Sequence, residues 1–387
     1  MESTSMRWLK SVAACFTEVN LDRDSGFIAW TDTVPEDRIR ALRRWNFYEA
    51  WAVFFIMMAV VWCDYWLDGP AMWRFRLVLG IPTLVWAFIL SPLVHYRWEK
   101  HVFLPPHRRA LGWRYFYWEC RGLGDPVAYY LPRNGTPPAL IRYWREVLIV
   151  LAMMTLLYCA AAVTFSHEID QRYAEWYPVF GGKIFFLIAL ILALDALWLF
   201  VGIPFMVRLD NFRNALRFIA AFLLGALVMI LLFNILFQVL LEPFRQSLES
   251  WHFLRLRGET ARERLAVLAD PLAIGGQWAG YVTWGWVQQF IFTSYYATLF
   301  ARSFPIERSR RELFKACLCS AFVFGMIHLP NAWLMLFTFL GGLLGGVLYF
   351  QMTNLFALGF SHGFAGSLLN KLTPINFSVG PDQMPGR

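Results

Sequence analysis

Residues 284–300 read WGWVQQFIFTSYYATLF, a segment in which two glutamines stand side by side among aromatic and branched aliphatic residues. A side-chain amide has two N–H donors and one oxygen acceptor to satisfy. Leaving such a polar group unpaired in an apolar medium costs roughly 1–3 kcal/mol. Gln288 and Gln289 therefore need partners, and the surrounding sequence indicates where those partners come from.

The composition of the chain places this segment in a membrane. Of the 387 residues, 58% are hydrophobic and 16% are charged, whereas about 25% of the residues of a soluble domain are charged. Apolar runs of about 20 residues, the length that a helix needs to cross a bilayer, recur along most of the chain. The sequence therefore predicts an all-α, polytopic transmembrane helical bundle of about eight to nine spans, and it excludes a soluble enzyme.

The predicted organisation has a polar N-terminal segment (1–45), a transmembrane region (46–273) with a basic cytoplasmic insertion (97–145), a transmembrane core (274–371) and a C-terminal tail (372–387). The apolar spans are expected near 46–66, 76–96, 146–165, 183–207, 217–241, 274–301, 315–331, 332–350 and 352–371. Residues 33–45, TVPEDRIRALRRW, are typical of a short amphipathic helix whose arginines face anionic headgroups. A solvated lead-in to the first span is the alternative.

The charge distribution predicts the orientation. The chain has a net charge of +8, and its basic residues gather in the loops at 96–121, 208–217 and 301–315. The loop at 166–183 is acidic on balance. The positive-inside rule then puts the N-terminus in the cytoplasm, and we expect a multi-pass protein of a bacterial inner membrane. Because the same rule accounts for the net positive charge, we expect no nucleic-acid partner. The expected partners are membrane lipids and a membrane protein or lipidated peptide.

Six polar residues lie deep inside the predicted spans, where such residues are functional candidates by default. Four of them share one depth at a rise of ~1.5 Å per residue: Gln289 roughly 18 Å, His328 roughly 19 Å and His362 roughly 15 Å from the cytoplasmic ends of their spans, with Gln288 beside Gln289. This agreement predicts a common internal site. Asp195 and Asn234 are left open, since each can pair with the site or with a neighbouring helix. Small residues in GGLLGG (341–346) and SHGFAGS (361–367) allow close helix packing around the site.

Three motifs in this region resemble those of the CAAX-protease and bacteriocin-processing (CPBP, or Abi) family of intramembrane proteases. The family pattern is Glu-Glu-x-x-x-Arg, then Phe-x-x-x-His, then His-x-x-x-Asn/Asp. The corresponding segments here are Gln288-Gln289-Phe-Ile-Phe-Thr293, Phe324-Gly-Met-Ile-His328 followed by Leu-Pro, and His362-Gly-Phe-Ala-Gly366. The resemblance covers about 274–371, a quarter of the chain.

The departures from the family pattern concern its charged residues. Both glutamates are replaced by Gln288 and Gln289, the arginine by Thr293, and the final Asn/Asp by Gly366. In the family, the second glutamate is taken to activate water, and the histidines to bind it or to steady an oxyanion. An amide takes no proton near neutral pH, so Gln289 is unable to act as a general base. The joint loss of glutamates and arginine is coherent, because a buried cation without a carboxylate would have no partner.

Three hypotheses follow. The first is a divergent intramembrane endopeptidase in which His328 or His362 is a base or metal ligand. Gln289 then orients water or the scissile carbonyl, and the other histidine stabilises the oxyanion. Zinc or another divalent metal stays open as a cofactor, although amides are weak ligands for it. The second is a non-catalytic relative that binds a transmembrane segment or lipid as a chaperone or assembly factor. The third, a transporter with a proton-relaying histidine pair, lacks an evident inverted repeat in the sequence.

Overall fold

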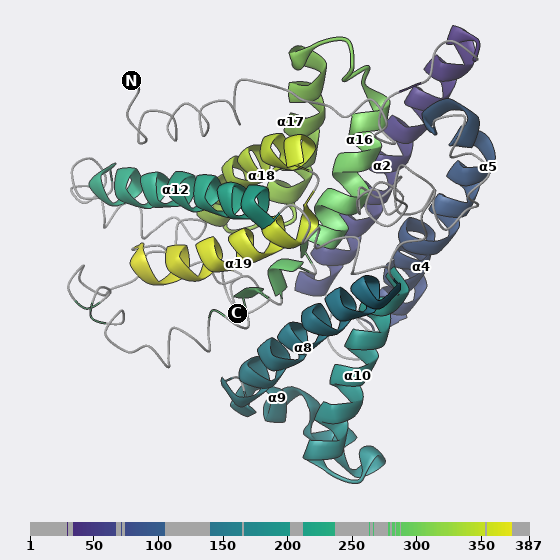
Figure 1. Ribbon diagram of the computed structural model, residues 1–387. Helices are drawn as coiled ribbons and strands as arrows, with labels where there is room; N and C mark the ends of the chain where they lie inside the picture. Colours follow the sequence, from purple (N-terminus) through teal and green to yellow (C-terminus); the bar gives the residue numbers. More distant parts are fainter. Residues whose placement is uncertain are drawn as a thin grey trace.

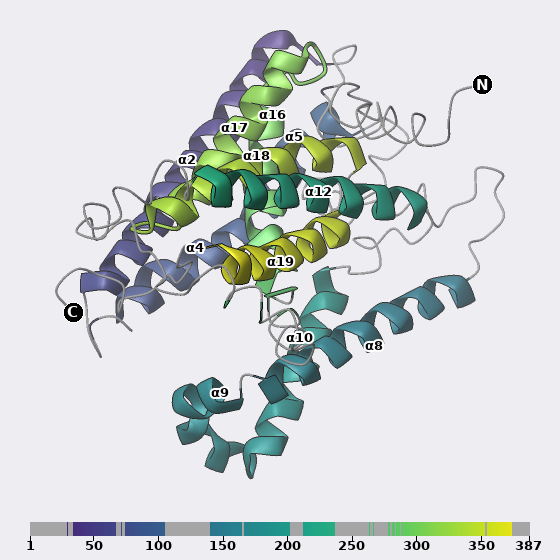
Figure 2. The same ribbon diagram turned by 90° about the vertical axis from the view of Figure 1, so that its left-hand side faces the viewer.

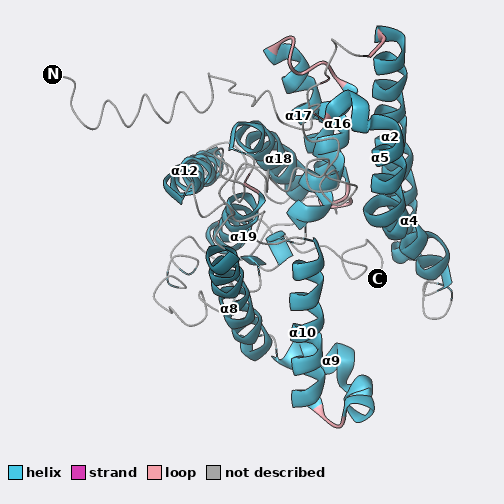
Figure 3. Ribbon diagram, turned by 45° about the vertical axis from the view of Figure 1, so that its right-hand side comes forward, coloured by secondary structure: helices cyan, strands magenta, loops and turns pink. Residues whose placement is uncertain are grey.

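The computed structural model is helical throughout the part of the chain that it describes (Figure 3). That part comprises residues 29, 34–66, 71, 74–104, 140–164, 166–201, 212–236, 263, 266, 278, 281–282, 284–286, 288–352 and 354–373. The larger helices are α2 (Glu36–Trp66), α5 (Ser91–Phe103), α8 (Leu140–Thr164), α10 (Lys183–Val201), α12 (Phe212–Leu236), α17 (Arg310–Met326), α18 (Ala332–Met352) and α19 (Leu355–Leu372). The predicted all-α class is confirmed.

Four described helices are long and apolar enough to cross a membrane: Glu36–Cys63, Arg76–Phe103, Ala215–Leu236 and Ala332–Phe350. A fifth span results if the short helix η5 (Ala174–Phe180) and the first part of α10 are taken together, although they are bent by 87°. Two glycines with positive φ, Gly181 and Gly182, make this bend. The chain is thus an integral membrane protein, and the count of eight to nine spans stays a prediction.

Helix α2 differs from the prediction for the N-terminal segment. It begins at Glu36 and continues without interruption to Trp66, so the arginine-rich stretch is the first part of the first span rather than a separate amphipathic helix. The sequence from 36 to 66 contains no glycine or proline. A change from polar to apolar side chains does not by itself end a helix, because the backbone hydrogen bonds continue through it.

The C-terminal helices pack around the segment that carries Gln288 and Gln289. Residues 288–303 form one continuous helix, in which α16 (Thr298–Ser303) follows the π-helix η10 (Phe290–Ala297). Helices α17 and α18, joined by residues 327–331, pack against each other, and α12 packs against both α18 and α19. Figures 1 and 2 show α12, α18 and α19 crossing the more upright α2, α16 and α17, while α8 and α10 extend away from this core.

A buried network of charged side chains joins α2, α5 and α16. His95 lies between two carboxylates, with Nε2 2.7 Å from Glu49 Oε2 and Nδ1 2.9 Å from Glu99 Oε1. Arg302 Nη1 binds Glu99 Oε2 at 2.9 Å, and Asn46 Nδ2 donates to Glu99 Oε1. All five side chains are less than 9% exposed. The two carboxylates are thus paired with an imidazole and a guanidinium, and buried charges in a low-dielectric interior require such pairing.

The network was not predicted from the sequence. Glu49 lies near the start of an expected span, Glu99 in the expected loop 96–121, and Arg302 in the expected basic loop 301–315. Helix α5 extends to Phe103 instead, which brings Glu99 inside the bundle. Because Arg302 is completely buried against Glu99, it no longer counts as a loop cation in the charge distribution.

The two polar residues that the sequence left open pair with neighbouring segments rather than with the predicted site. Thr155 Oγ1 on α8 donates to Asp195 Oδ2 on α10 at 2.9 Å. Asn234 Nδ2 on α12 donates to the backbone oxygens of Ile230 and of Leu372, the last residue of α19, at 2.9 and 3.1 Å. Both side chains therefore form hydrogen bonds to a neighbouring segment, which is one of the two interpretations that the sequence allowed.

At the acidic loop, Lys183 connects the start of α10 to the preceding helix α9 (Ser166–Tyr173). Its Nζ lies 2.7 Å from Asp170 Oδ2 and 2.7 Å from Ser166 Oγ. The hydrogen bond from Lys183 lowers the pKa of the Asp170 carboxyl. The two side chains are partly exposed, so we expect the pair to contribute little to stability.

Candidate functional site

Gln288 and His362 meet in the structure, as their matched depth predicted. The imidazole Nε2 of His362 on α19 lies 2.8 Å from the amide oxygen Oε1 of Gln288. A carbonyl oxygen only accepts hydrogen bonds, so Nε2 carries the proton and donates it. Two consequences follow: the Nδ1 lone pair of His362 stays available, and the NH₂ group of Gln288 is left to donate to another acceptor.

Glycines on α19 make this contact possible by letting two helices touch. A Cβ atom added to Gly363 would lie 2.3 Å from the Cα of Val282, and one added to Gly359 would lie 2.2 Å from the side chain of Trp286. Both distances are far below any real contact, so the backbones can approach this closely only without side chains. The close packing expected of the small residues at 361–367 is seen at Gly363, and Gly359, which the sequence did not single out, contributes in the same way.

We expect Gly363→Ala to push α19 away from residues 281–289 and to separate His362 from Gln288. Overpacking of this kind typically costs about 1–3 kcal/mol, and the variant should lower both the stability and any activity of the site. Gly366→Ala is the matched control, because its Cβ would meet only the ring of Tyr281 at 3.4 Å. Denaturant titrations of the two variants in detergent test the difference, and equal stabilities would contradict the packing argument.

Gln289 is fixed from within its own helix. Thr293 Oγ1 donates to Gln289 Oε1 at 2.5 Å, and the two side chains are only 6% and 5% exposed, respectively. Thr293 stands at the position of the arginine in the family pattern, so a neutral donor replaces a cation beside a neutral amide. The bond lies at the start of η10, and π-helical segments are rare and frequently occur at functional sites.

A small cavity adjoins this pair. Its volume is about 10 Å³, close to the space that one water molecule needs. Gln289, Thr293 and Ser320 contribute polar atoms, Phe324 contributes a ring, and the glycines of α18 form the opposite wall. The wall consists of Gly341, Gly342, Gly345 and Gly346, which the sequence singled out as small residues near the site. The cavity thus has the size and the polar partners to hold one water molecule.

His328 lies in the turn between α17 and α18, at the end of the Phe-x-x-x-His motif. Its Nδ1 is 2.7 Å from the backbone oxygen of Phe324. The carbonyl fixes Nδ1 as the protonated nitrogen, which leaves the Nε2 lone pair as an acceptor. The side chain is 8% exposed. His328 therefore has a defined tautomer with one basic nitrogen.

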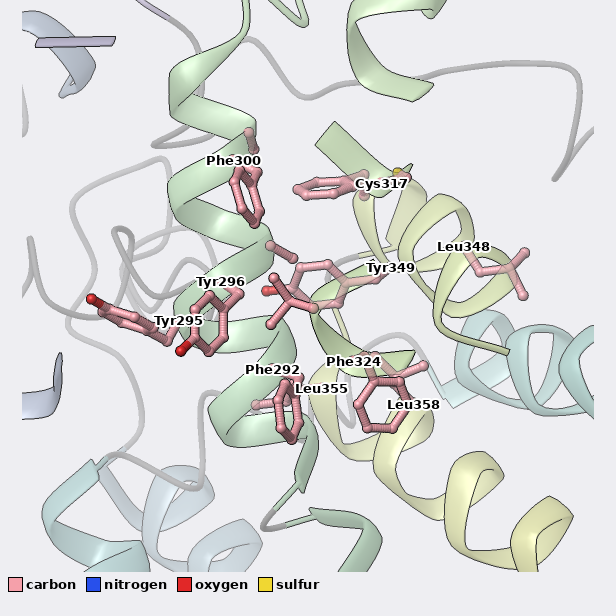
Figure 4. Close-up of a cluster of buried hydrophobic side chains, with 14 of the residues drawn as sticks. Phe292, Tyr295, Tyr296, Phe300, Cys317, Phe324, Leu348, Tyr349, Leu355 and Leu358 are labelled. Atoms are coloured by element: carbon pink, nitrogen blue, oxygen red, sulfur yellow. The ribbon is translucent and has the colours of Figure 1, made fainter. Parts of the chain in front are cut away.

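Three of the four predicted site residues, His328, His362 and Gln289, lie around Phe324, and Gln288 joins them through His362. Its ring centroid lies 5.2 Å from that of His328 and 5.4 Å from that of His362. The same ring contacts Phe292 and lines the cavity beside Gln289. Figure 4 shows Phe292 and Phe324 within the buried cluster between η10 and the C-terminal helices. The direct polar contact that the structure gives is Gln288 with His362, whereas Gln289 and His328 bond to Thr293 and to the Phe324 backbone.

The donors of this site do not fit zinc. Two imidazole nitrogens are available, and the remaining polar groups are amides and hydroxyls, whereas zinc in proteins takes three or four ligands from cysteine, histidine and carboxylates. Within the described residues, no three His, Cys, Asp or Glu side chains come together as a metal-ligand group.

A paired imidazole and amide, and a second imidazole with a free basic nitrogen, define a buried site of polar side chains among the C-terminal helices. The family model described as type II CAAX prenyl endopeptidase Rce1-like matches residues 271–368. This part of the chain is therefore an Rce1-like domain of the CPBP family, as the three motifs indicated, and it covers about a quarter of the chain. No curated protein and no solved structure matches the chain.

Proposed function

We propose that the chain is an intramembrane endopeptidase that cleaves a membrane-embedded or lipid-modified polypeptide with an altered catalytic set. The observation that supports this most directly is the fixed tautomer of His328. Its Nδ1 is bound to the Phe324 carbonyl, so Nε2 is the basic atom that the family's glutamate no longer supplies. In this proposal Nε2 takes a proton from water while the water oxygen attacks the scissile carbonyl.

The two glutamines supply the oxyanion site in this mechanism. Their acceptor oxygens are already occupied, Oε1 of Gln288 by His362 and Oε1 of Gln289 by Thr293. Their NH₂ groups are therefore the parts that can donate to a substrate. Side-chain amides placed in this way stabilise the negative charge that develops on the carbonyl oxygen, and the loss of one such donor typically costs about 10²–10³ in rate.

The proton then moves to the leaving amine. His328, protonated at both nitrogens after the attack, is the group that returns the proton from Nε2 when the C–N bond breaks. The bond from Nδ1 to the Phe324 carbonyl is kept throughout, and it holds the ring in one orientation. His362 is a positioning residue here, since it acts on the substrate only through Gln288.

A second candidate function is a non-catalytic relative that binds a transmembrane segment or a lipid. Two observations favour it: neither Gln288 nor Gln289 offers a carboxylate, and the cavity beside Gln289 holds about one water and no peptide backbone. Substrate entry would require the C-terminal helices to separate, which binding without cleavage does not demand.

Comparing membrane peptidomes distinguishes the two candidates. Cells with the wild-type chain, with His328→Ala and with a deletion are compared by mass spectrometry of new N-termini, at equal protein levels. An endopeptidase should give defined fragments that disappear in both the deletion and His328→Ala. If the deletion destabilises a membrane protein while every fragment is unchanged in His328→Ala, the endopeptidase proposal fails and the binding relative stands.

A further inference from the structure

A groove of about 300 Å³ lies between the beginning of α2 and the C-terminal end of α16. Its lining residues are Arg40, Arg43, Arg44, Phe47, Tyr48, Ser303 and Phe304. Three of the seven are cations, two are aromatic residues of α2, and none is acidic. The groove thus combines positive charge with apolar surface.

Arg43 is a buried lining residue of the groove, and its guanidinium is already bound. Its Nη2 lies 2.7 Å from Glu307 Oε1, and its Nη1 donates to the backbone oxygens of Arg302, at 3.3 Å, and Phe304. These carbonyls belong to the last turn of α16, where a cation is favourable because the helix end carries partial negative charge. Arg43 therefore holds the groove in shape and leaves ligand binding to the other two arginines.

Arg40 and Arg44 are exposed and stand one turn apart on the same face of α2. Like charges four residues apart on a helix repel each other. Among the described residues, neither forms an ion pair with a carboxylate; Glu307 pairs with Arg43, and Glu36 with Arg308. An anion between Arg40 and Arg44 would remove this repulsion, and a guanidinium pair is well suited to the oxygens of a phosphate.

The position of the groove along α2 indicates the kind of anion. Trp45 and Tyr48, 38% and 66% exposed, follow the arginines directly, and the exposed side chains of Phe55 and Ile56 come two turns later. Aromatic residues of this kind gather at the boundary between headgroups and hydrocarbon. A ligand in the groove would thus meet cations at one end and lipid-facing aromatic surface at the other.

We propose that this groove binds an anionic glycerophospholipid. Arg40 and Arg44 hold its phosphate, and Phe47 and Tyr48 contact the glycerol and the first part of an acyl chain. A peptide carboxylate would use the same arginines, but it brings no acyl chain for the aromatic wall, so the lipid is favoured.

Native mass spectrometry of the full chain in maltoside micelles tests this proposal, with short-chain phosphatidylglycerol as the probe and phosphatidylcholine, glycerol phosphate and a free-acid heptapeptide as comparisons. The double variant Arg40→Gln/Arg44→Gln should bind phosphatidylglycerol roughly 30-fold more weakly than the wild type. The control variant Arg310→Gln/Arg311→Gln removes two exposed cations of α17, so that it loses the same charge outside the groove, and it should bind as the wild type does.

Several results would overturn the proposal: unchanged binding in the groove variant, an equal loss in the control, or phosphatidylcholine binding as tightly as phosphatidylglycerol. Equally tight binding of glycerol phosphate would assign the site to a free phosphate, and binding of the heptapeptide alone would assign it to a carboxylate. Should the double variant fail to fold, Arg44→Gln alone is measured, with an expected loss of roughly fivefold.

Discussion

Arg302→Ala is expected to lower the free energy of unfolding by about 3–5 kcal/mol, because it leaves Glu99 as a buried carboxylate without its guanidinium partner. Both side chains are completely buried, so water does not replace the lost contact. The variant also loses the contact of the guanidinium with the Phe103 ring, whose centroid lies 5.1 Å from Cζ. Denaturant titration in mixed micelles, followed by tryptophan fluorescence, measures the change.

Two further variants separate the burial of the charge from the charge itself. Arg308→Ala removes a cation whose pairing with Glu36 is largely exposed, and it should cost at most about 1 kcal/mol. In the double variant Glu99→Gln/Arg302→Gln neither charge remains. Its loss of unfolding free energy should therefore be smaller than the summed losses of the single variants Glu99→Gln and Arg302→Gln. A cost below 1 kcal/mol for Arg302→Ala would show that the network is not important for stability.

The second large effect concerns the reaction. His328→Ala should lower the turnover of a purified substrate about 10²–10⁴-fold, the usual contribution of a general base, with a much smaller change in KM. The reason is the loss of the one imidazole whose free nitrogen is set by a backbone hydrogen bond. Turnover is measured on a fragment identified in the peptidome comparison, with the protein in vesicles.

Thr338→Ala is the control for this measurement. It removes a buried hydroxyl that is bonded to the backbone oxygens of Leu334 and Met335 on α18, and it should leave turnover within a few-fold of the wild type. Equal turnover in His328→Ala and the wild type would exclude His328 as the base. If both variants lose turnover together with stability, the loss reports packing and not proton transfer.

The parts of the site that depend on depth could be predicted from the sequence. Counting residues along each span placed Gln288 and His362 at one level, and the structure joins them at 2.8 Å. Glycines at 359 and 363 then decided how closely their helices approach. The bonds of Gln289 to Thr293 and of His328 to the Phe324 backbone join residues four apart, which share a helix face. Spacing alone does not decide whether such a side chain bonds within its own segment or to a neighbouring helix, so these two bonds were not foreseen.

The charged network could not be predicted, because its members lie at positions in the sequence where charged residues are common. Glu49, Glu99 and Arg302 each lie near the end of an apolar run, and there solvent or headgroups usually satisfy a charge. One local signal was present: His95 and Glu99 are four residues apart and therefore on one face of a helix. Recognising Arg302 as their partner requires the three-dimensional packing of segments 203 residues apart.

That separation also matters while the chain is being made. At a synthesis rate of roughly 5–20 residues per second, roughly 10–40 s pass between Glu99 and Arg302. During this interval Glu99 on α5 has His95 beside it but lacks the Arg302 guanidinium that later binds it. The Rce1-like domain thus does more than carry the candidate site: its helix α16 supplies the guanidinium that pairs with Glu99 on the earlier helix α5.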